Sequence, residues 1–275
     1  MLNLKEIHKP ATLADALKLL QQPGTVALAG GSALIADQRR DVQAVVDLSA
    51  LGLAYIRESS GAIALGAMTT LAELNDSPIL RALANGLIAQ AAHRSTASVL
   101  RNQATIAGTL ISEPAGILAV ALLALDAQMT LMEKTTRTIA LAEFLRELRE
   151  SREIRKSLVT EISVPMTNPR ASMHIVARTP SDKPIVSVIA SARIENQVAR
   201  DVRIALGGVG ETALRASAAE KILEGQTLND ALIENAVGAI HESPLHPRGD
   251  FRGSAEYRKE MAIVLTRRAV KELIA

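Results

Sequence analysis

Cysteine and tryptophan are absent from this 275-residue chain, and other aromatic side chains are scarce. Without a thiol, the chain forms no disulfide, carries no thiolate nucleophile and binds no zinc ion or iron–sulfur cluster through cysteine. Its aromatic residues apart from histidine are Tyr55, Phe144, Phe251 and Tyr257. Because single-stranded nucleic acids stack their bases on aromatic rings, this composition argues against a nucleic-acid-binding function.

A dominant sign of charge and a long apolar run are also missing. The 31 basic and 29 acidic residues are interspersed and leave a net charge of +2, so no polyanionic partner is indicated. The longest apolar run, 116–125, is well short of the ~18 residues of a membrane span and predicts a buried helix. Residues 1–17 lack the basic stretch and apolar core of a secretory signal, which favours a cytoplasmic protein without a membrane span.

Motifs for catalysis by side chains are missing as well. The five histidines show no metal-binding spacing, and no serine lies in a Gly-x-Ser-x-Gly turn. We therefore predict no catalytic side chain and no metal site. If the chain takes part in a reaction, a cofactor must supply the reactive groups.

The apolar pattern divides the chain into three parts, of which the first two alternate helices and strands. Residues 1–54 read as a small α/β unit, in which Thr12 caps a helix and two apolar strands follow. Residues 55–168 begin with a hairpin whose turn contains Ser60 and Gly61. The segments expected beyond this hairpin are helices at 69–77, 79–95 and 117–125, strands at 127–133 and 158–165, and a strand leading into a helix at 136–148.

Residues 169–275 are predicted to form a separate α+β domain after a proline-containing linker, Pro165–Ala171. Three strand segments precede three helical segments, which favours helices on one face of a three-stranded antiparallel sheet. The strands are expected at 172–179, 186–195 and 197–209, and the helices at 217–225, 230–241 and 254–275. The glycine pair within 205–210 predicts a strand end that packs closely on a helix.

Two glycine-containing loops are the best candidates for an anion site. In Leu28–Leu34 a strand ends in two glycines, whose backbone N–H groups approach an anion closely because no Cβ intervenes, and Ser32 adds a hydroxyl donor. In Leu100–Ser112, Arg101 would pair with an anion, Asn102 would shape the turn, and a single glycine follows an apolar strand. The alternatives are a tight strand exit needing positive φ and an ordinary turn. The presence of both loops on two α/β units that face one crevice favours the anion site.

Segments along nearly the whole chain resemble one protein family. Among them are "AGGSAL", "RNQATIAGTL", "LVTEISVP", "RIALGGVGETALRA" and "GSAEYRKEMAIVLTRRAV", which occur in the same order as in that family. The chain resembles the FAD-binding medium subunit of the molybdenum hydroxylases, which include carbon monoxide dehydrogenases and xanthine dehydrogenases. The resemblance implies a two-part FAD-binding domain of the vanillyl-alcohol-oxidase (PCMH) type, 1–54 and 55–168, followed by the C-terminal α+β domain at 169–275.

The resemblance also implies a function as a flavoprotein subunit of a multi-subunit oxidoreductase. In the family, electrons pass from the iron–sulfur clusters of a partner subunit through FAD to an external acceptor. Molybdopterin and [2Fe–2S] clusters are expected only in the partners, a large molybdopterin subunit and a small iron–sulfur subunit, assembled as a dimer of heterotrimers. The lack of cysteine in this chain agrees with that division.

Site residues follow from the same resemblance. The predicted cofactor-binding residues are Ala29, Gly30, Gly31, Ser32, Ala33, Leu34, Arg101, Asn102, Thr105, Ile106, Ala107, Gly108, Thr109, Val159 and Asp182. The second loop departs from the family's Thr-Ile-Gly-Gly-Asn, because Ala107 adds a Cβ that would resist positive φ and Thr109 replaces the asparagine.

Three more positions depart from the family pattern. Ile117 stands where an aspartate is common, Ile175 where many members have lysine, and Lys183 where an aromatic residue is frequent. These departures support an alternative hypothesis, in which the chain is a degenerate paralogue that binds FAD weakly or not at all and serves as a structural or assembly module.

Overall fold

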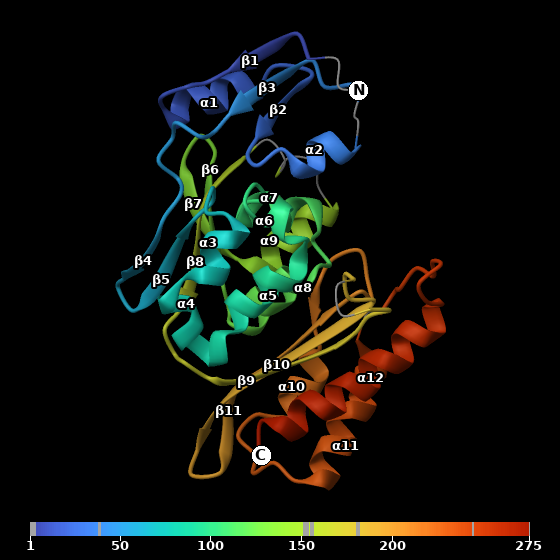
Figure 1. Ribbon diagram of the computed structural model, residues 1–275. Coiled ribbons are helices and arrows are strands. Elements are labelled where there is room, and N and C mark those ends of the chain that lie inside the picture. The colour runs from blue at the N-terminus through green and yellow to red at the C-terminus, as the bar shows by residue number, and fades with distance from the viewer. Residues whose placement is uncertain are drawn as a thin grey trace.

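Three β-sheets with surrounding helices make up the protein (Figure 1). The computed structural model describes residues 4–37, 40–150, 154, 157–179, 182–243 and 245–274. The first sheet has strand order β1-β3-β2, the second β4-β5-β8-β6-β7, and the third β12-β11-β10-β9. The chain passes through them in sequence, from the blue N-terminal sheet to the red C-terminal helix in Figure 1.

The first sheet is parallel and belongs to the α/β unit predicted at the N-terminus. Its elements are β1 (Glu6–His8), α1 (Leu13–Leu20), β2 (Thr25–Leu28), α2 (Ser32–Asp37) and β3 (Ala44–Asp47). The predicted cap is present, because the Asp15 N–H donates to Thr12 Oγ1 over 3.1 Å. Strand β1 was not predicted, since its three largely exposed residues give no periodicity.

The second sheet is antiparallel and starts with the predicted hairpin. Its strands are β4 (Ile56–Ser59), β5 (Ala62–Gly66), β6 (Gln128–Met132), β7 (Thr136–Ala140) and β8 (Leu158–Pro165). Ser60 and Gly61 have φ of 49° and 78°, as the two-residue turn of a twisted hairpin requires.

Helices cover this sheet, and one predicted helix is broken. They are α3 (Leu71–Asp76), α4 (Pro78–Ala82), η1 (Leu83–Gly86), α5 (Leu87–Ser95), α6 (Ser98–Arg101), α7 (Ile106–Ser112), α8 (Ile117–Ala124) and α9 (Leu141–Glu150). The single helix expected at 79–95 was wrong, because Ala84, Asn85 and Gly86 are left-handed, with φ of 47°, 57° and 74°. The Ala84 N–H instead donates to Asn168 Oδ1 over 2.8 Å, a contact between residues far apart in the sequence.

Helix α8 lies at the centre of the molecule. Each of its residues is at most 3% exposed, which confirms the predicted buried helix. In the part of the chain that the structure describes, no single helix is long and apolar enough to cross a membrane. The pair α7 and α8 passes that test jointly, but the two helices are bent by 109°.

The third sheet is antiparallel and has four strands, one more than predicted. Its elements are β9 (Arg170–Val176), β10 (Val186–Glu195), β11 (Val198–Gly207) and β12 (Leu214–Arg215), with helices α10 (Ser217–Leu223), α11 (Asp230–Gly238), η3 (Ala239–Glu242) and α12 (Ala255–Glu272). The added strand β12 pairs only Leu214 and Arg215 with β11, which is too short for periodicity to reveal.

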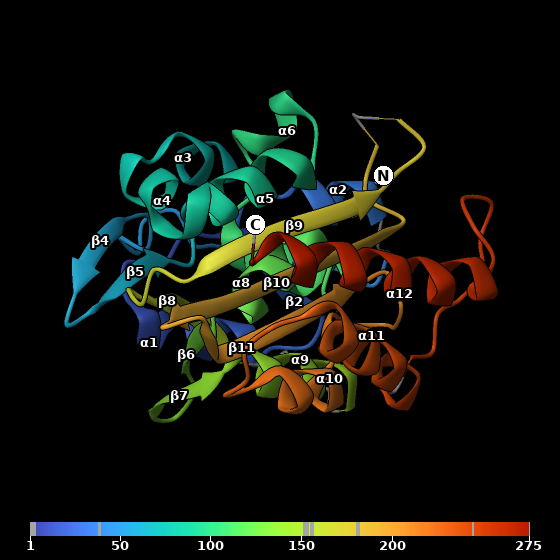
Figure 2. The ribbon, with the colours of Figure 1, turned by 90° about the horizontal axis from the view of Figure 1, so that it is seen from below.

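Both faces of the third sheet are covered. Helix α12 packs along β9 and β10 on one face (Figure 2), and α8 packs on β10 and β11 on the other. Alternation along β10 shows the two faces, since Ile189 joins the α8 core while Val188 and Ala190 join the core of the C-terminal helices. The predicted close strand end is confirmed at Gly207, where an added Cβ would lie 2.6 Å from Val120 of α8.

A network of ion pairs also connects α8 with the third sheet. Asp126, directly after α8, accepts hydrogen bonds from Arg203 at 2.6 Å and Arg215 at 2.9 Å. Glu220, 6% exposed, accepts from both Arg215 and the Ile204 N–H, each at 2.8 Å. Because the carboxylate of Glu220 is almost completely removed from water, its charge is stable there only while all of its hydrogen-bond partners are present.

We expect Glu220→Ala to lower the free energy of unfolding by about 3–5 kcal/mol, since it leaves the half-buried Arg215 without its nearest carboxylate. Chemical denaturation followed by circular dichroism measures this change. The matched control is Glu234→Ala, which removes an exposed partner of Arg267 and should leave the midpoint unchanged. Equal midpoints for the two variants would contradict the assigned role.

Candidate functional site

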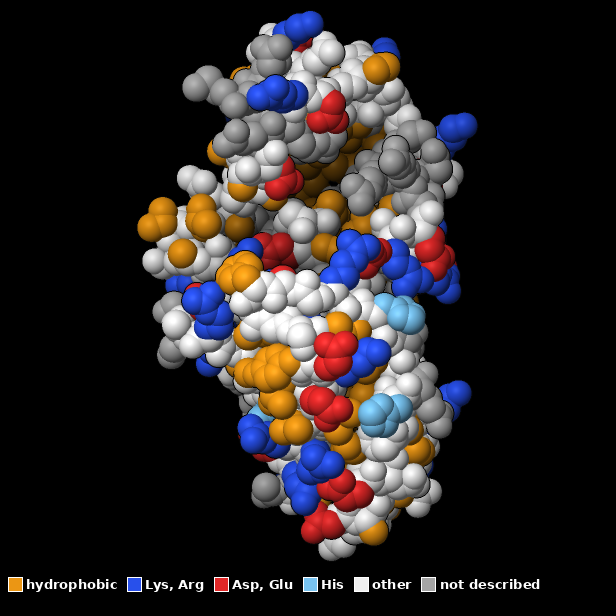
Figure 3. Space-filling view, turned by 90° about the vertical axis from the view of Figure 1, so that its right-hand side faces the viewer, with side chains coloured by type: hydrophobic (Ala, Val, Ile, Leu, Met, Phe, Trp, Pro, Cys, Tyr) orange, Lys and Arg blue, Asp and Glu red, His pale blue; other side chains and the backbone are white. Residues whose placement is uncertain are grey.

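A large cavity lies between the first sheet and the second part of the chain. Its volume is about 1130 Å³, slightly above the roughly 300–1,000 Å³ typical of small-molecule sites. On the face shown in Figure 3, a recess lined by hydrophobic side chains opens below the N-terminal region. The cavity is lined by all residues of the 25–34 segment, by residues of α7 and its flanks such as Thr105 and Pro114, and by residues near the end of α9 and the start of β8 such as Leu148 and Val159.

The first predicted loop forms one wall of this cavity and requires both of its glycines. Gly31 has φ +73°, which confirms the positive φ considered for a tight strand exit. A Cβ on Gly30 would lie 1.7 Å from the carbonyl oxygen of Gln103. The glycine at position 30 therefore allows the first loop to rest on the backbone that enters the second loop.

Backbone N–H groups at the start of α2 lack protein acceptors. The first hydrogen bond of this helix runs from the Ile35 N–H to the Gly31 carbonyl over 3.0 Å. Within the described residues, the N–H groups of Ser32, Ala33 and Leu34 have no hydrogen-bond partner, and all three residues line the cavity. Unpaired N–H groups at a helix start carry partial positive charge and favour an anion.

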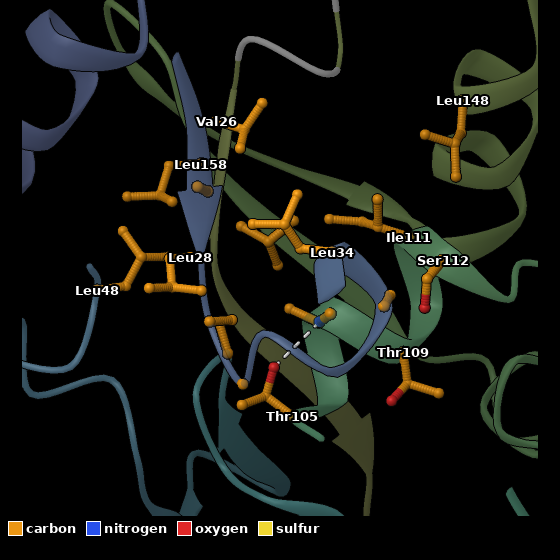
Figure 4. A pocket seen from close by; sticks show the side chains of 18 of the residues that line it. Val26, Leu28, Leu34, Leu48, Thr105, Thr109, Ile111, Ser112, Leu148 and Leu158 are labelled. Carbon is orange, nitrogen blue, oxygen red and sulfur yellow. Dashed lines mark hydrogen bonds between the residues drawn. The ribbon is translucent and has the colours of Figure 1, made fainter. Parts of the chain in front are cut away.

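The second predicted loop has a different structure from the one expected. Residues Ala107 and Gly108 lie inside helix α7 and do not follow a strand, and Ala107 has no positive φ. Its Cβ therefore causes no backbone strain, and that expectation was wrong. Thr105 caps the helix by accepting the Gly108 N–H over 3.2 Å, the dashed line in Figure 4.

Most N–H groups at the start of α7 are already paired within the protein. The Ile106 N–H donates to the Thr69 carbonyl over 2.9 Å, and the Ala107 N–H donates to the Ala67 carbonyl over 3.2 Å. The hydroxyl-bearing residues Thr109 and Ser112 of α7 also line the cavity (Figure 4).

The structure brings most of the predicted site residues together. Those that line the cavity are Ala29, Gly30, Gly31, Ser32, Ala33, Leu34, Thr105, Ala107, Gly108, Thr109 and Val159. Those that do not line it are Arg101, Asn102, Ile106 and Asp182. The Arg101 guanidinium donates to the His93 and Thr96 carbonyls at 3.0 and 2.9 Å, at the end of α5, and Ile106 is fully buried.

The apolar wall of the cavity was missed by sequence reasoning. Val26, Leu28, Leu48 and Leu158 lie on one side of the cavity, and Leu148 lies on the other side near Ile111 (Figure 4). These side chains come from separate segments and carry no motif, so only the fold identifies them.

A second cavity of about 280 Å³ adjoins the first, and Ser112 and Pro114 line both. It lies where the α7–α8 connection meets the third sheet. Its charged lining residues are Arg94, Glu113, Lys183, Glu211, Arg252 and Arg258.

The base of the second cavity is held rigidly. Arg258, 5% exposed, donates to the Ile185 carbonyl at 2.7 Å, the Gly208 carbonyl at 3.2 Å and Asp250 at 2.8 Å. The Arg252 N–H, together with the guanidinium groups of Arg252 and Arg258, holds the pKa of Asp250 well below its ordinary value. Within the described residues, no group of three or more His, Cys, Asp or Glu could hold a metal ion.

An apolar cavity beside a helix start with unpaired N–H groups, within α/β units, is typical of a dinucleotide-binding protein. Residues 3–167 match the family described as the FAD binding domain in molybdopterin dehydrogenase, and residues 171–273 match the CO dehydrogenase flavoprotein C-terminal domain. The chain belongs to this family of oxidoreductase flavoproteins. The predicted family, fold class and cofactor are thereby confirmed.

Relatives match along nearly the whole chain. The glyceraldehyde dehydrogenase medium chain of Sulfolobus acidocaldarius is 29% identical, with 95% of each chain covered. Subunit alpha of the 6-hydroxypseudooxynicotine dehydrogenase complex of Paenarthrobacter nicotinovorans is 31% identical, with 96% of this chain and 92% of that one covered. A solved carbon monoxide dehydrogenase from Hydrogenophaga pseudoflava, lacking the Mo-pyranopterin moiety, superposes with a TM-score of 0.89 at 27% identity, covering 97% of this chain and 96% of that one.

The residues present fit FAD. The unpaired N–H groups of Ser32, Ala33 and Leu34 suit its pyrophosphate, and the apolar end of the large cavity suits the adenine. The polar second cavity adjoins this space and suits the hydrogen-bonding edge of the flavin ring.

We expect Gly30→Ala to lower the free energy of unfolding by about 1–3 kcal/mol, because its Cβ would collide with the Gln103 carbonyl and separate the two loops. The matched control is Gly238→Ala, where no atom lies within 4 Å and φ is −57°, so alanine should leave stability equal or higher. Urea unfolding of both variants measures the difference. A Gly30→Ala protein as stable as the control would show that the loops are not in contact.

Proposed function

We propose that the chain is the FAD-binding electron-transfer subunit of a molybdenum hydroxylase. Electrons would arrive from the iron–sulfur clusters of a small partner subunit and leave through FAD to an external acceptor. A large molybdopterin subunit completes the complex, as a dimer of heterotrimers in the cytoplasm. The family match over 3–167 and the absence of cysteine support this division between subunits.

FAD, when bound, supplies the ability to accept and donate electrons reversibly. The protein's own residues bind and orient it. The proposed ligands of the pyrophosphate are the N–H groups of Ser32, Ala33 and Leu34, with the Thr109 hydroxyl on the facing wall. Val159 and the neighbouring leucines exclude water from the adenine end.

The unpaired N–H groups at the start of α2 are the observation that carries this proposal. A polar group at a partly enclosed site is normally hydrogen-bonded, and a phosphate supplies the missing acceptor. Arg101 and Asn102 support the second loop instead, since Arg101 holds the end of α5 and Asn102 ends α6. We also propose that the chain divides at residues 54 and 168 into the two parts of the FAD-binding domain and the C-terminal domain.

One observation favours the alternative, a degenerate paralogue with a structural or assembly role. The N–H groups of Ile106, Ala107 and Gly108 are already paired within the protein. These three amides of the second loop are therefore not available to a phosphate, and phosphate binding depends on the first loop.

We expect the purified chain to show, or to acquire with added FAD, an absorbance band at ~450 nm, because the flavin supplies the chromophore. A chain without this band, which FAD does not restore, would favour the alternative. Copurification of the small and large subunits, and reduction of the flavin by them, tests the proposed electron route.

The first loop is tested by comparing Ser32→Pro with Ser32→Ala. Proline at the first helical position removes one N–H and is compatible with the helix, whereas alanine removes only the hydroxyl. A lost hydrogen bond to a charged group corresponds to about 1.5–3 kcal/mol, so FAD should bind Ser32→Pro roughly ten- to a hundredfold more weakly than Ser32→Ala. Fluorescence titration with FAD gives both dissociation constants, and equal values would exclude the assigned pyrophosphate contact.

A further inference from the structure

An ion pair stands where the two cavities meet. Glu113 directly follows α7, and its neighbours Ser112 and Pro114 line both cavities. Lys183 comes from the connection between β9 and β10 and pairs its ammonium with Glu113. Both charged residues line the second cavity, where the pair bridges the FAD-binding part and the C-terminal domain.

Lys183 differs from the other cations of the second cavity in how it is held. Arg258 is fixed by two carbonyls and Asp250, and Arg252 donates to Asp250 at 3.1 and 3.0 Å. The side chain of Lys183 is 52% exposed, and in the part of the chain described its recorded partner is Glu113. A long flexible stem lets this ammonium turn toward a new negative charge.

The second cavity has no aromatic lining residue among those described, so a flavin ring there would contact aliphatic and charged groups. When two electrons and one proton are added to a flavin ring, the ring gains one negative charge. A cation beside a partly buried ring stabilises the charged, reduced form more than the neutral, oxidised form, and an anion does the opposite.

We propose that Lys183 raises the reduction potential of the bound flavin and that Glu113 opposes it, so that this ion pair sets the potential at which the subunit exchanges electrons. This inference rests on the proposed function and goes beyond it by assigning the control of potential to two residues. A band of charged side chains crosses the face below the apolar recess (Figure 3).

The test uses the full chain loaded with FAD, with the midpoint potential measured by spectral equilibration against a reference dye. We expect Lys183→Met to shift the equilibrium at least tenfold toward oxidised flavin, which is about 30 mV for a two-electron couple. Glu113→Gln should shift it in the opposite direction. Lys183→Arg, which keeps the charge, should stay close to the native value.

Lys271→Met is the matched control. Lys271 also forms a half-exposed ion pair, with Asp230 at 2.7 Å, and its side chain is 45% exposed. It lies on α12 roughly 20 Å along the helix from Arg258, at 1.5 Å per residue, and should leave the potential unchanged.

The two proposals fail in different ways. If every variant binds FAD with unchanged thermal midpoints but the potentials of Lys183→Met and Glu113→Gln equal the native one, or move in the same direction, the inference is overturned and the proposed function stands. If the native chain does not bind FAD at all, both are overturned. Dissociation constants for FAD, measured on the same samples, separate a change in potential from a loss of binding.

Discussion

Close contact between two backbone segments is the constraint on which the rest of the structure depends. Gly30 rests on the Gln103 carbonyl, in a space that a single Cβ would fill. From the other side, the Leu71 N–H donates to the Ala104 carbonyl over 2.8 Å, and the Ile106 N–H donates to Thr69. Residues 103–106 are therefore held between the N-terminal sheet and the capped helix α3. These contacts position the start of α2 opposite α7 and thereby define the cavity between them.

Helix α8 connects this part of the structure with the C-terminal domain by packing against both. Its apolar side chains point in every direction and are buried on all sides, so it must be surrounded by protein. The second sheet's helices cover one side of it, and β10 and β11 cover the other. The ion pairs of Asp126 with Arg203 and Arg215 then fix the orientation at its end, because their geometry is directional where apolar contact is not.

The two cavities differ in the chemistry of their lining. The larger one is mainly aliphatic and has unpaired N–H groups at one point, which suits a ligand with a charged middle and an apolar end. Among the described residues, the smaller one is lined by four cations and two carboxylates, and each guanidinium nitrogen of its buried Arg258 donates a hydrogen bond. A ligand that spans both would pass the Glu113–Lys183 pair, which makes the charge balance there sensitive to a single substitution.

Local rules determined much of this protein from its sequence. Thr12 and Thr70 cap helices, Ser60-Gly61 turns a hairpin, and the all-apolar 116–125 segment forms a buried helix, because each depends on neighbours within a few residues. The tertiary structure decided the rest. Asn168 accepts the hydrogen bond of the Ala84 N–H where the helix expected at 79–95 is broken. The carbonyls of Thr69 and Ala67 accept hydrogen bonds from the N–H groups that the second loop was expected to offer to a ligand. It also decided that Lys183 meets Glu113. These contacts join residues that are distant in the chain. A local sequence pattern does not indicate which distant backbone group or charge the fold brings next to a given residue.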